Sequence, residues 1–156
     1  DACVSHLSQD LAEDLRAACP DGIDIYFENV GGKTFEAVLR LLNKHARVTR
    51  CGLISQYGNT DGRDPGEVWF ETGQSIFERQ ACDVFPLAVR EFVADHQDTF
   101  LERMAEWLKD GRVRYREDIR PGLENTPKIF REMLEGGNFG KTLIQVSPDP
   151  TRETGD

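Results

Sequence analysis

The 156-residue sequence has no apolar run near the roughly 20 residues that a helix needs to cross a bilayer. It opens without a basic segment followed by an apolar core, so it shows no secretory signal. Its formal net charge of −9 argues against a nucleic-acid surface, because phosphate binding requires clustered Lys and Arg. We therefore expect a soluble protein without membrane or nucleic-acid partners, forming one ordinary domain or two incomplete pieces.

Cysteine and histidine are few, and neither forms a pattern that binds metal. The four cysteines include no C-x-x-C pair, and no histidine lies near them at zinc-ligand spacing. We expect buried free thiols in a reducing cytoplasm and no metal site. The residues concerned are Cys3, Cys19, Cys51, Cys82, His6, His45 and His96.

The sequence also lacks the glycine-rich turn G-x-G-x-x-G with which a dinucleotide-binding fold normally opens. Its glycine pairs, Gly31-Gly32 and Gly136-Gly137, do not match that spacing. The order of strands and helices nevertheless resembles the second part of a doubly wound α/β domain. We therefore expect a fold that begins partway through, without the first strand of its parallel sheet.

A strand that leads into a polar loop is the most informative feature present. Residues 24–30 form a short apolar and aromatic run, and Gly31-Gly32 follows it directly. Such a run, bounded by turn signals, is typical of a parallel sheet covered on both faces. Because open α/β folds bind ligands at the carboxyl edge of the sheet, we expect Asn29 at an edge that faces a ligand.

A second segment of the same design, residues 46–57, follows one helix later and again passes from a strand into small and polar residues. Between the two segments, residues 33–42 carry apolar side chains at helical spacing. A strand, a helix and a strand of these lengths indicate a βαβ unit. The two loops would then lie at one sheet edge and form one wall of a cofactor site.

The remaining elements follow from periodicity and from Gly, Pro and Asn punctuation. The expected helices are residues 8–18, 68–78 and 98–110, and a helix that begins at 125–127 and closes at Gly136-Gly137. The expected strands are residues 2–5, 84–89, 112–115 and 141–146. Pro86 favours an edge or an end for the strand that contains it.

Four motifs, taken together and in this order, resemble the medium-chain dehydrogenase/reductase superfamily. The similarity is greatest to the zinc-independent leukotriene and prostaglandin reductase branch, which includes bacterial curcumin reductases. The motifs are Phe27–Gly32, Cys51–Tyr57, Gly122–Pro127 and Gly137–Lys141, and the resemblance extends over residues 1–146.

The resemblance implies an α/β fold with an incomplete Rossmann-like, doubly wound parallel sheet that lacks its first strand and glycine-rich turn. Residues 1–97 would form a partial NAD(P)-binding domain. Residues 98–146 would be a carboxyl-terminal α+β segment that packs on a catalytic domain upstream, and residues 147–156 a disordered tail. The family further implies a homodimer built through the nucleotide domain.

The resemblance also implies NADPH as cofactor and assigns residues to it. Asn29 and Asn138 resemble asparagines that contact the cofactor, and the stretch from Cys51 to Tyr57 resembles a loop along its nicotinamide half. His6 and Leu7 stand where the family usually has tyrosine and lysine near the adenosine 2′-phosphate, which weakens the preference for NADPH over NADH. The full set is His6, Asn29, Cys51, Gly52, Leu53, Ile54, Ser55, Gln56, Tyr57, Leu87, Ala88, Val89 and Asn138. Leu87, Ala88 and Val89 stand where the family has an aromatic-aliphatic-aliphatic strand beside the nicotinamide, and Pro86 and Leu87 depart from that pattern.

The reaction implied is reduction of an alkene conjugated to a ketone or aldehyde, by hydride transfer from the nicotinamide to a small-molecule enone or enal. The protein would orient the substrate and stabilise the developing enolate, with Tyr57 as candidate hydrogen-bond donor. We expect the chain alone to be inactive, because the phosphate-binding turn and most of the substrate pocket would lie upstream. Quinone reduction and a non-catalytic assembly or cofactor-binding module remain as alternatives.

Each candidate residue also has a structural interpretation. Asn29 could cap the next helix, Tyr57 could pack against the sheet, and Asn138 could adopt a left-handed turn conformation. A carboxylate at a strand end more often pairs locally or faces water than acts as a general base, so Glu28 is not expected to be catalytic.

Overall fold

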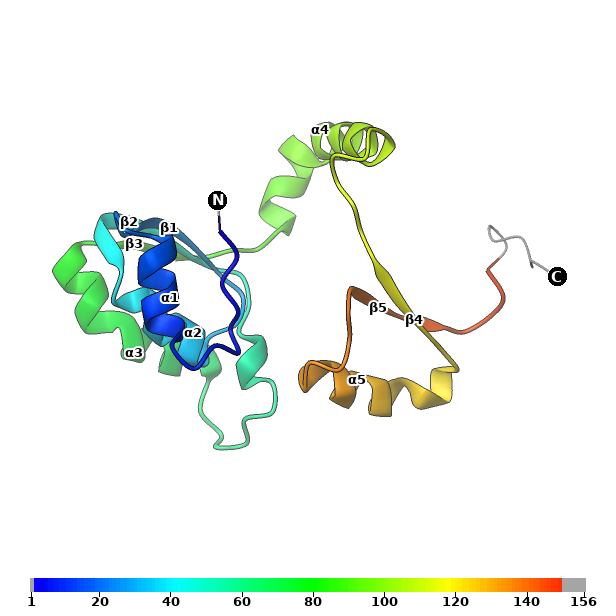
Figure 1. Ribbon diagram of the computed structural model, residues 1–156, viewed down its shortest axis with the longest axis horizontal. Coiled ribbons are helices and arrows are strands. Elements are labelled where there is room, and N and C mark those ends of the chain that lie inside the picture. Colours follow the sequence, from blue (N-terminus) through cyan, green and yellow to red (C-terminus); the bar gives the residue numbers. More distant parts are fainter. Residues whose placement is uncertain (1, 150–156) are drawn as a thin grey trace. The chain divides into compact units, whose positions relative to one another are not determined.

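The computed structural model describes residues 2–149 (Figure 1). The helices are α1 (Leu11–Ala18), α2 (Gly32–Leu39), α3 (Pro65–Gln80), α4 (Arg90–Lys109) and α5 (Thr126–Leu134), with short 3-10 turns at Ile54–Gln56 and Leu123–Asn125. The strands are β1 (Ile23–Glu28), β2 (Leu42–Arg50), β3 (Asp83–Pro86), β4 (Glu117–Pro121) and β5 (Lys141–Gln145). The chain divides into two compact units, with the boundary inside α4 between Glu91 and Phe92.

The first unit contains a three-stranded parallel sheet in the order β1-β2-β3. Phe27 of β1 is level with Thr49 of β2, and Thr49 is level with Phe85 of β3. Because the strands are parallel and α2 and α3 connect them, all three carboxyl ends lie at one edge of the sheet. The expected βαβ unit and the mixed α/β fold with a parallel sheet are thus confirmed.

The core of this unit lies between the sheet and its helices. Alternate residues of β2, Ala46 and Val48, pack with Phe35 of α2 and with Trp69 and Phe77 of α3. The Phe35 and Trp69 rings stack with centroids 4.8 Å apart, a separation at which aromatic pairs attract each other. This aromatic cluster therefore fixes α2 and α3 against the sheet.

The other face of the sheet is not covered as the sequence predicted. Ile25 and Phe27 of β1 are 62% and 53% exposed, and Phe85 of β3 is also exposed. The continuous apolar run predicts a strand buried on both faces, whereas β1 buries only its alternate residues against the helices. An apolar run alone does not distinguish these two cases, because burial depends on which layers are present.

Several boundaries in the first unit differ from those expected. Residues 2–5 form no strand, and α1 begins only at Leu11, after a turn in which Ser8 Oγ accepts from the N–H of Asp10. Leu42 belongs to β2 and not to the preceding helix. An irregular stretch in β2 accounts for its early start, since Ile23 pairs with Leu42 whereas Ile25 already pairs with Arg47.

α3 is longer than its predicted core. Asp64 caps it by accepting the N–H of Glu67 at 2.9 Å, and Pro65 occupies the first turn. These are the residue types that a helix start favours, so the sequence carried a signal for a start before residue 68. The strand expected at residues 84–89 is shorter in the structure, because β3 ends at Pro86; it lies at the edge of the sheet, as Pro86 favoured.

The second unit contains a two-stranded parallel sheet, β4 with β5, connected through α5. The expected helix from residues 125–127 and the last strand are confirmed. The strand expected at residues 112–115 is wrong, because the pairing segment is Glu117–Pro121. α4 begins at Arg90, well before the expected residue 98.

Candidate functional site

Two loops lie side by side where β1 and β2 end. The N–H groups of Cys51 and Gly52 donate to the carbonyl of Glu28 at 2.8 and 3.1 Å. The N–H of Ile54 donates to the carbonyl of Asn29 at 3.1 Å, and the N–H of Ser55 to that of Val30 at 3.0 Å. Four backbone hydrogen bonds thus join the loops into one surface, as the positions of the two strands predicted. We call this surface, residues 29–32 with 51–57, the paired-loop edge.

Asn29 is exposed at this edge. A Cβ atom placed on Gly52 would lie 3.3 Å from Asn29 Oδ1, so the amide lies directly against the second loop. The alternative role as a helix cap is wrong, because the residue that caps α2 is Gly31. The Asn29 amide therefore remains available to a ligand.

Tyr57 closes the second loop and is 64% exposed. Its N–H donates to the carbonyl of Ile54 at 3.3 Å, which ends a short 3-10 turn. The alternative in which the ring packs against the sheet is therefore wrong. The phenol is free to approach a bound molecule.

Leu87, Ala88 and Val89 continue past β3 at the same edge of the sheet. The N–H of Leu87 donates to the carbonyl of Arg50 at 2.9 Å, which extends the pairing of β3 with β2. Leu87 and Ala88 are half-buried, whereas Val89 is 76% exposed. All three carboxyl ends of the sheet therefore carry candidate residues.

His6 lines a pocket between the amino-terminal segment and α2. The pocket has a volume of about 560 Å³ and is also lined by Lys33 and Arg40. His6 and Leu7 are both exposed.

Asn138 belongs to the second unit, in the turn between α5 and β5. It is half-buried, and its Nδ2 donates to the carbonyl of Gly140 at 2.9 Å. The left-handed alternative is wrong, because within residues 2–149 the non-glycine residues with positive φ are His45 and Ala81.

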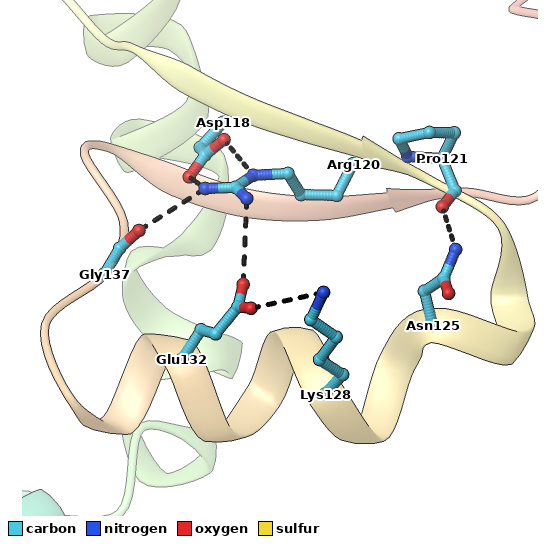
Figure 2. A network of polar contacts seen from close by, with 7 residues as sticks. All are labelled: Asp118, Arg120, Pro121, Asn125, Lys128, Glu132 and Gly137. Carbon is cyan, nitrogen blue, oxygen red and sulfur yellow. Dashed lines mark hydrogen bonds and ion pairs between the residues drawn. The ribbon is translucent and has the colours of Figure 1, made fainter.

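A charged network holds the turn that contains Asn138 (Figure 2). Arg120 of β4 bonds Asp118 through two nitrogens, at 2.6 and 2.9 Å, and donates to the carbonyl of Gly137 at 3.3 Å. Glu132 of α5 lies 3.8 Å from Arg120 and 3.7 Å from Lys128. The Arg120 guanidinium holds the pKa of the Asp118 carboxyl below its usual range.

Glu28 belongs to the site in a way that the sequence did not indicate. It is fully buried; its Oε1 accepts the N–H groups of Val30 and Gly31, and its Oε2 accepts the indole N–H of Trp69. Burial, together with the Glu28 carboxylate, raises the pKa of the neighbouring Tyr26 phenol. A carboxylate ending an apolar strand was the available signal, but its partner Trp69 lies 41 residues away.

The cysteines are free thiols, as expected, but the expectation that they are buried is wrong. Cys3 and Cys51 are exposed, and Cys19 and Cys82 are half-buried. Within the part of the chain that the structure describes, no three or more His, Cys, Asp or Glu side chains gather where they could hold a metal ion. The helices of residues 2–149 include none with the length and apolarity to cross a membrane.

Comparison with known proteins identifies the family. A model of the zinc-binding dehydrogenase family matches residues 1–144. The chain is 41% identical to the NADPH-dependent curcumin reductase of Escherichia coli over 149 residues, which are 96% of this chain and 43% of that protein. It is 34% identical to prostaglandin reductase 1 of Rattus norvegicus over 136 residues, 87% of this chain and 40% of that protein.

Solved structures agree with the sequence relatives. The crystal structure of CurA in complex with NADPH from Vibrio vulnificus matches with a TM-score of 0.80 at 39% identity, covering 96% of this chain and 44% of that one. The chain thus spans about two fifths of the length of the curated relatives named here. It belongs to the zinc-binding dehydrogenase family, in the curcumin and prostaglandin reductase-like branch of the medium-chain dehydrogenase/reductase superfamily.

Proposed function

We propose that this chain contributes NADPH-binding residues to a reductase that reduces the carbon–carbon double bond of an α,β-unsaturated ketone or aldehyde. The observation that carries the proposal is the paired-loop edge, where Asn29 and Tyr57 are both exposed on loops fixed to each other. The relatives named as NADPH-dependent curcumin reductase and as CurA in complex with NADPH support the same cofactor.

The residues at this edge suit a nicotinamide cofactor. A primary amide can donate and accept at once, so Asn29 can pair with a carboxamide or a ribose hydroxyl. Gly52 carries no side chain, which leaves room for the Asn29 amide. A Cβ atom at Gly52 would lie only 3.3 Å from Asn29 Oδ1. We assign the nicotinamide half to Asn29, to residues 51–57 and to residues 87–89. His6 and Asn138 are assigned to the cofactor by family resemblance.

Bound NADPH would supply the hydride that reaches the β-carbon of the enone. The contribution of the chain is to orient the cofactor and to stabilise negative charge on the carbonyl oxygen. Tyr57 is assigned the second task, because its exposed phenol O–H is a hydrogen-bond donor. Stabilising an enolate in this way contributes to the rate through the transition state and not through substrate affinity.

The proposal includes two properties of the isolated chain. It turns over no enone, because the sequence contains no phosphate-binding turn of the form G-x-G-x-x-G. Family resemblance further assigns a cytoplasmic homodimer, which size-exclusion chromatography with light scattering tests directly.

The binding part of the proposal is tested by titrating the chain with NADPH, and with NADH in parallel, while following the fluorescence of Trp69 and Trp107. We expect saturable binding of NADPH that Asn29→Ala weakens about tenfold, the equivalent of one hydrogen bond in a partly buried site. Asn59→Ala is the matched control, because it removes another exposed asparagine from the loop that follows Tyr57. Equal weakening by both variants would contradict the assignment of Asn29.

The catalytic part is tested by following NADPH oxidation with a simple enone and with a quinone. We expect no turnover by the isolated chain. In a longer protein that contains this chain, Tyr57→Phe should lower kcat for the enone by at least about tenfold, with little change in KM. Turnover of the quinone alone would favour the quinone reductase alternative, and NADPH binding without any turnover in such a protein would favour a non-catalytic module.

A further inference from the structure

Glu28 has an arrangement that general stability alone does not require. Its carboxylate is completely buried, yet among residues 2–149 no Lys or Arg forms an ion pair with it. Instead it accepts N–H groups from Val30 at 2.7 Å, Gly31 at 2.9 Å and Trp69 at 3.0 Å. The Tyr26 phenol also bonds to this carboxylate. Because a buried carboxylate is costly unless its oxygens are bonded, these donors stabilise it.

The backbone donors belong to the loop that carries Asn29. The N–H groups of Val30 and Gly31 immediately follow Asn29 and lead into α2, which begins at Gly32. Gly31 has φ of 76°, and a Cβ there would lie 3.2 Å from Ser55 Oγ. The turn is therefore tight and close to the second loop, and Glu28 Oε1 holds it in that conformation.

The third donor connects the same turn to the helical layer. Trp69 stacks on Phe35 of α2 and lies beneath the guanidinium of Arg50, 5.6 Å from the ring centroid. The main-chain carbonyl of Glu28 meanwhile accepts from Cys51 and Gly52. One residue thus bonds both loops of the paired-loop edge and the helix behind them. Because Glu28 has no exposed surface, it does not contact a bound molecule directly.

We propose that Glu28 is a positioning residue: its buried carboxylate fixes the backbone of residues 29–31 so that the Asn29 amide faces the cofactor. This inference rests on the proposed function, since it assumes that NADPH binds at the paired-loop edge. Glu28 acts through Asn29 and does not itself touch the cofactor.

The test uses Glu28→Gln and Trp69→Phe in the 156-residue chain. Glutamine keeps the shape but presents an NH2 group to the indole N–H, so two donors face each other. Phenylalanine keeps an aromatic ring and removes that N–H. Phe77→Leu is the control, because Phe77 belongs to the same core cluster but forms none of the bonds to the loop.

Two quantities are measured: hydrogen exchange at the Val30 and Gly31 amides by NMR, and the Kd for NADPH from the fluorescence of the nucleotide. In Glu28→Gln we expect about tenfold faster exchange at both amides and an approximately tenfold higher Kd, the scale of one strained buried hydrogen bond. Phe77→Leu should lower the unfolding midpoint. It should leave the Kd for NADPH unchanged, and exchange at the Val30 and Gly31 amides should rise no more than the exchange that global unfolding causes.

The double variant Glu28→Gln/Trp69→Phe gives the sharpest result. Because it removes the conflict between the two donors, it should bind NADPH more tightly than the two single effects added together predict. Additive losses would overturn the positioning role, as would normal exchange and normal Kd in Glu28→Gln. If Glu28→Gln fails to fold, Trp69→Phe provides the test. Unchanged exchange at the Val30 and Gly31 amides and an unchanged Kd for NADPH in Trp69→Phe would also overturn the positioning role.

Failure of the proposed function is distinguishable from failure of this inference. If the wild-type chain does not bind NADPH, the proposed function fails for this chain, and the cofactor part of the inference fails with it. Faster exchange at Val30 and Gly31 in Glu28→Gln, absent from Phe77→Leu, would still support Glu28 as the residue that orders the turn. Unchanged exchange would overturn that as well.

Discussion

The two units hold an asparagine-bearing turn by opposite physical means. In the first unit, Glu28 is fully buried and bonds uncharged N–H groups around Asn29. In the second, the side chain of Arg120 is 36% exposed and bonds charged partners and the carbonyl of Gly137, next to Asn138. Both turns belong to a βαβ arrangement of parallel strands. The buried arrangement should depend on shape and the exposed one on salt and pH, because water screens charges only where it reaches them.

The largest effect that distinguishes the units is expected from Trp69→Ala. It removes a buried ring that packs on Phe35 and also the indole donor to Glu28. Removing a buried tryptophan costs about 3–5 kcal/mol, and a buried carboxylate would lose a partner in addition. Urea unfolding followed by circular dichroism should show a much lower midpoint for the first unit. A midpoint within error of the wild type would show that the aromatic cluster does not hold that unit together.

A smaller effect is expected from Arg120→Met in the second unit. The variant leaves the half-buried Asp118 without its bidentate partner and frees the Gly137 carbonyl. We expect hydrogen exchange at residues 137–139 to become several-fold faster at low salt, with little change at Val30 and Gly31. Adding salt to the wild type should move exchange in the same direction, because screening weakens exposed ion pairs. Arg112→Met, which breaks a different exposed ion pair, is the matched control.

The pH dependence of the second unit should follow Asp118. Its pKa is lowered in the folded chain, chiefly by the hydrogen bonds from Arg120 and with smaller contributions from the Phe139 N–H and from Arg116. A lowered folded pKa stabilises the chain above the unfolded value of about 3.9, and that stabilisation is lost as pH falls through the folded pKa. The protection of the amides at residues 137–139, taken relative to the intrinsic exchange rate at each pH, should fall as the pH is lowered from about 6 to about 3, through and below the reference value of a carboxyl. Asp118→Asn should flatten this profile, and an unchanged profile would assign it to another group.

The smallest effect is expected from Lys128→Ala. Lys128 pairs with Glu132 across one turn of α5, and its side chain is 78% exposed. Such a pair contributes about 0.3 kcal/mol, so the unfolding midpoint should barely move. A large loss would mean that the network in Figure 2 acts cooperatively and that its exposed members matter more than their exposure suggests.

Local signals predicted those parts of the fold in which the deciding residues are neighbours in the chain. Asn125-Thr126-Pro127 marked the start of α5, and Pro86 marked the end of β3. The strand and loop at residues 24–32 predicted the paired-loop edge. Where pairing across distance decided, the prediction failed: Arg112–Tyr115 has the alternation of a strand, but Glu117–Pro121 is the segment that pairs with β5.

In the candidate site, too, the residues marked by their neighbours in the sequence were predicted, and those that depend on distant partners were not. Asn29 and Tyr57 were found because each follows a strand whose carboxyl end faces a ligand in open α/β folds. The Asp118, Arg120 and Glu132 network was not anticipated, because Glu132 is distant in sequence from the strand residue it approaches. Exposure of Cys51 was also missed, since the sequence does not show on which side of the loop its thiol lies.

By itself, the sequence determined the five helices among residues 2–149, most of the strands, the two loops of the paired-loop edge and the motifs by which the chain resembles its family. These depend on backbone propensities and on residues a few positions apart. The tertiary structure alone decided that Glu28 is buried and that Asn29 lies against Gly52. The physical reason is that the partners of Glu28 and Asn29 come from other segments, and a hydrogen bond or a close contact exists only once the fold has brought its two atoms together.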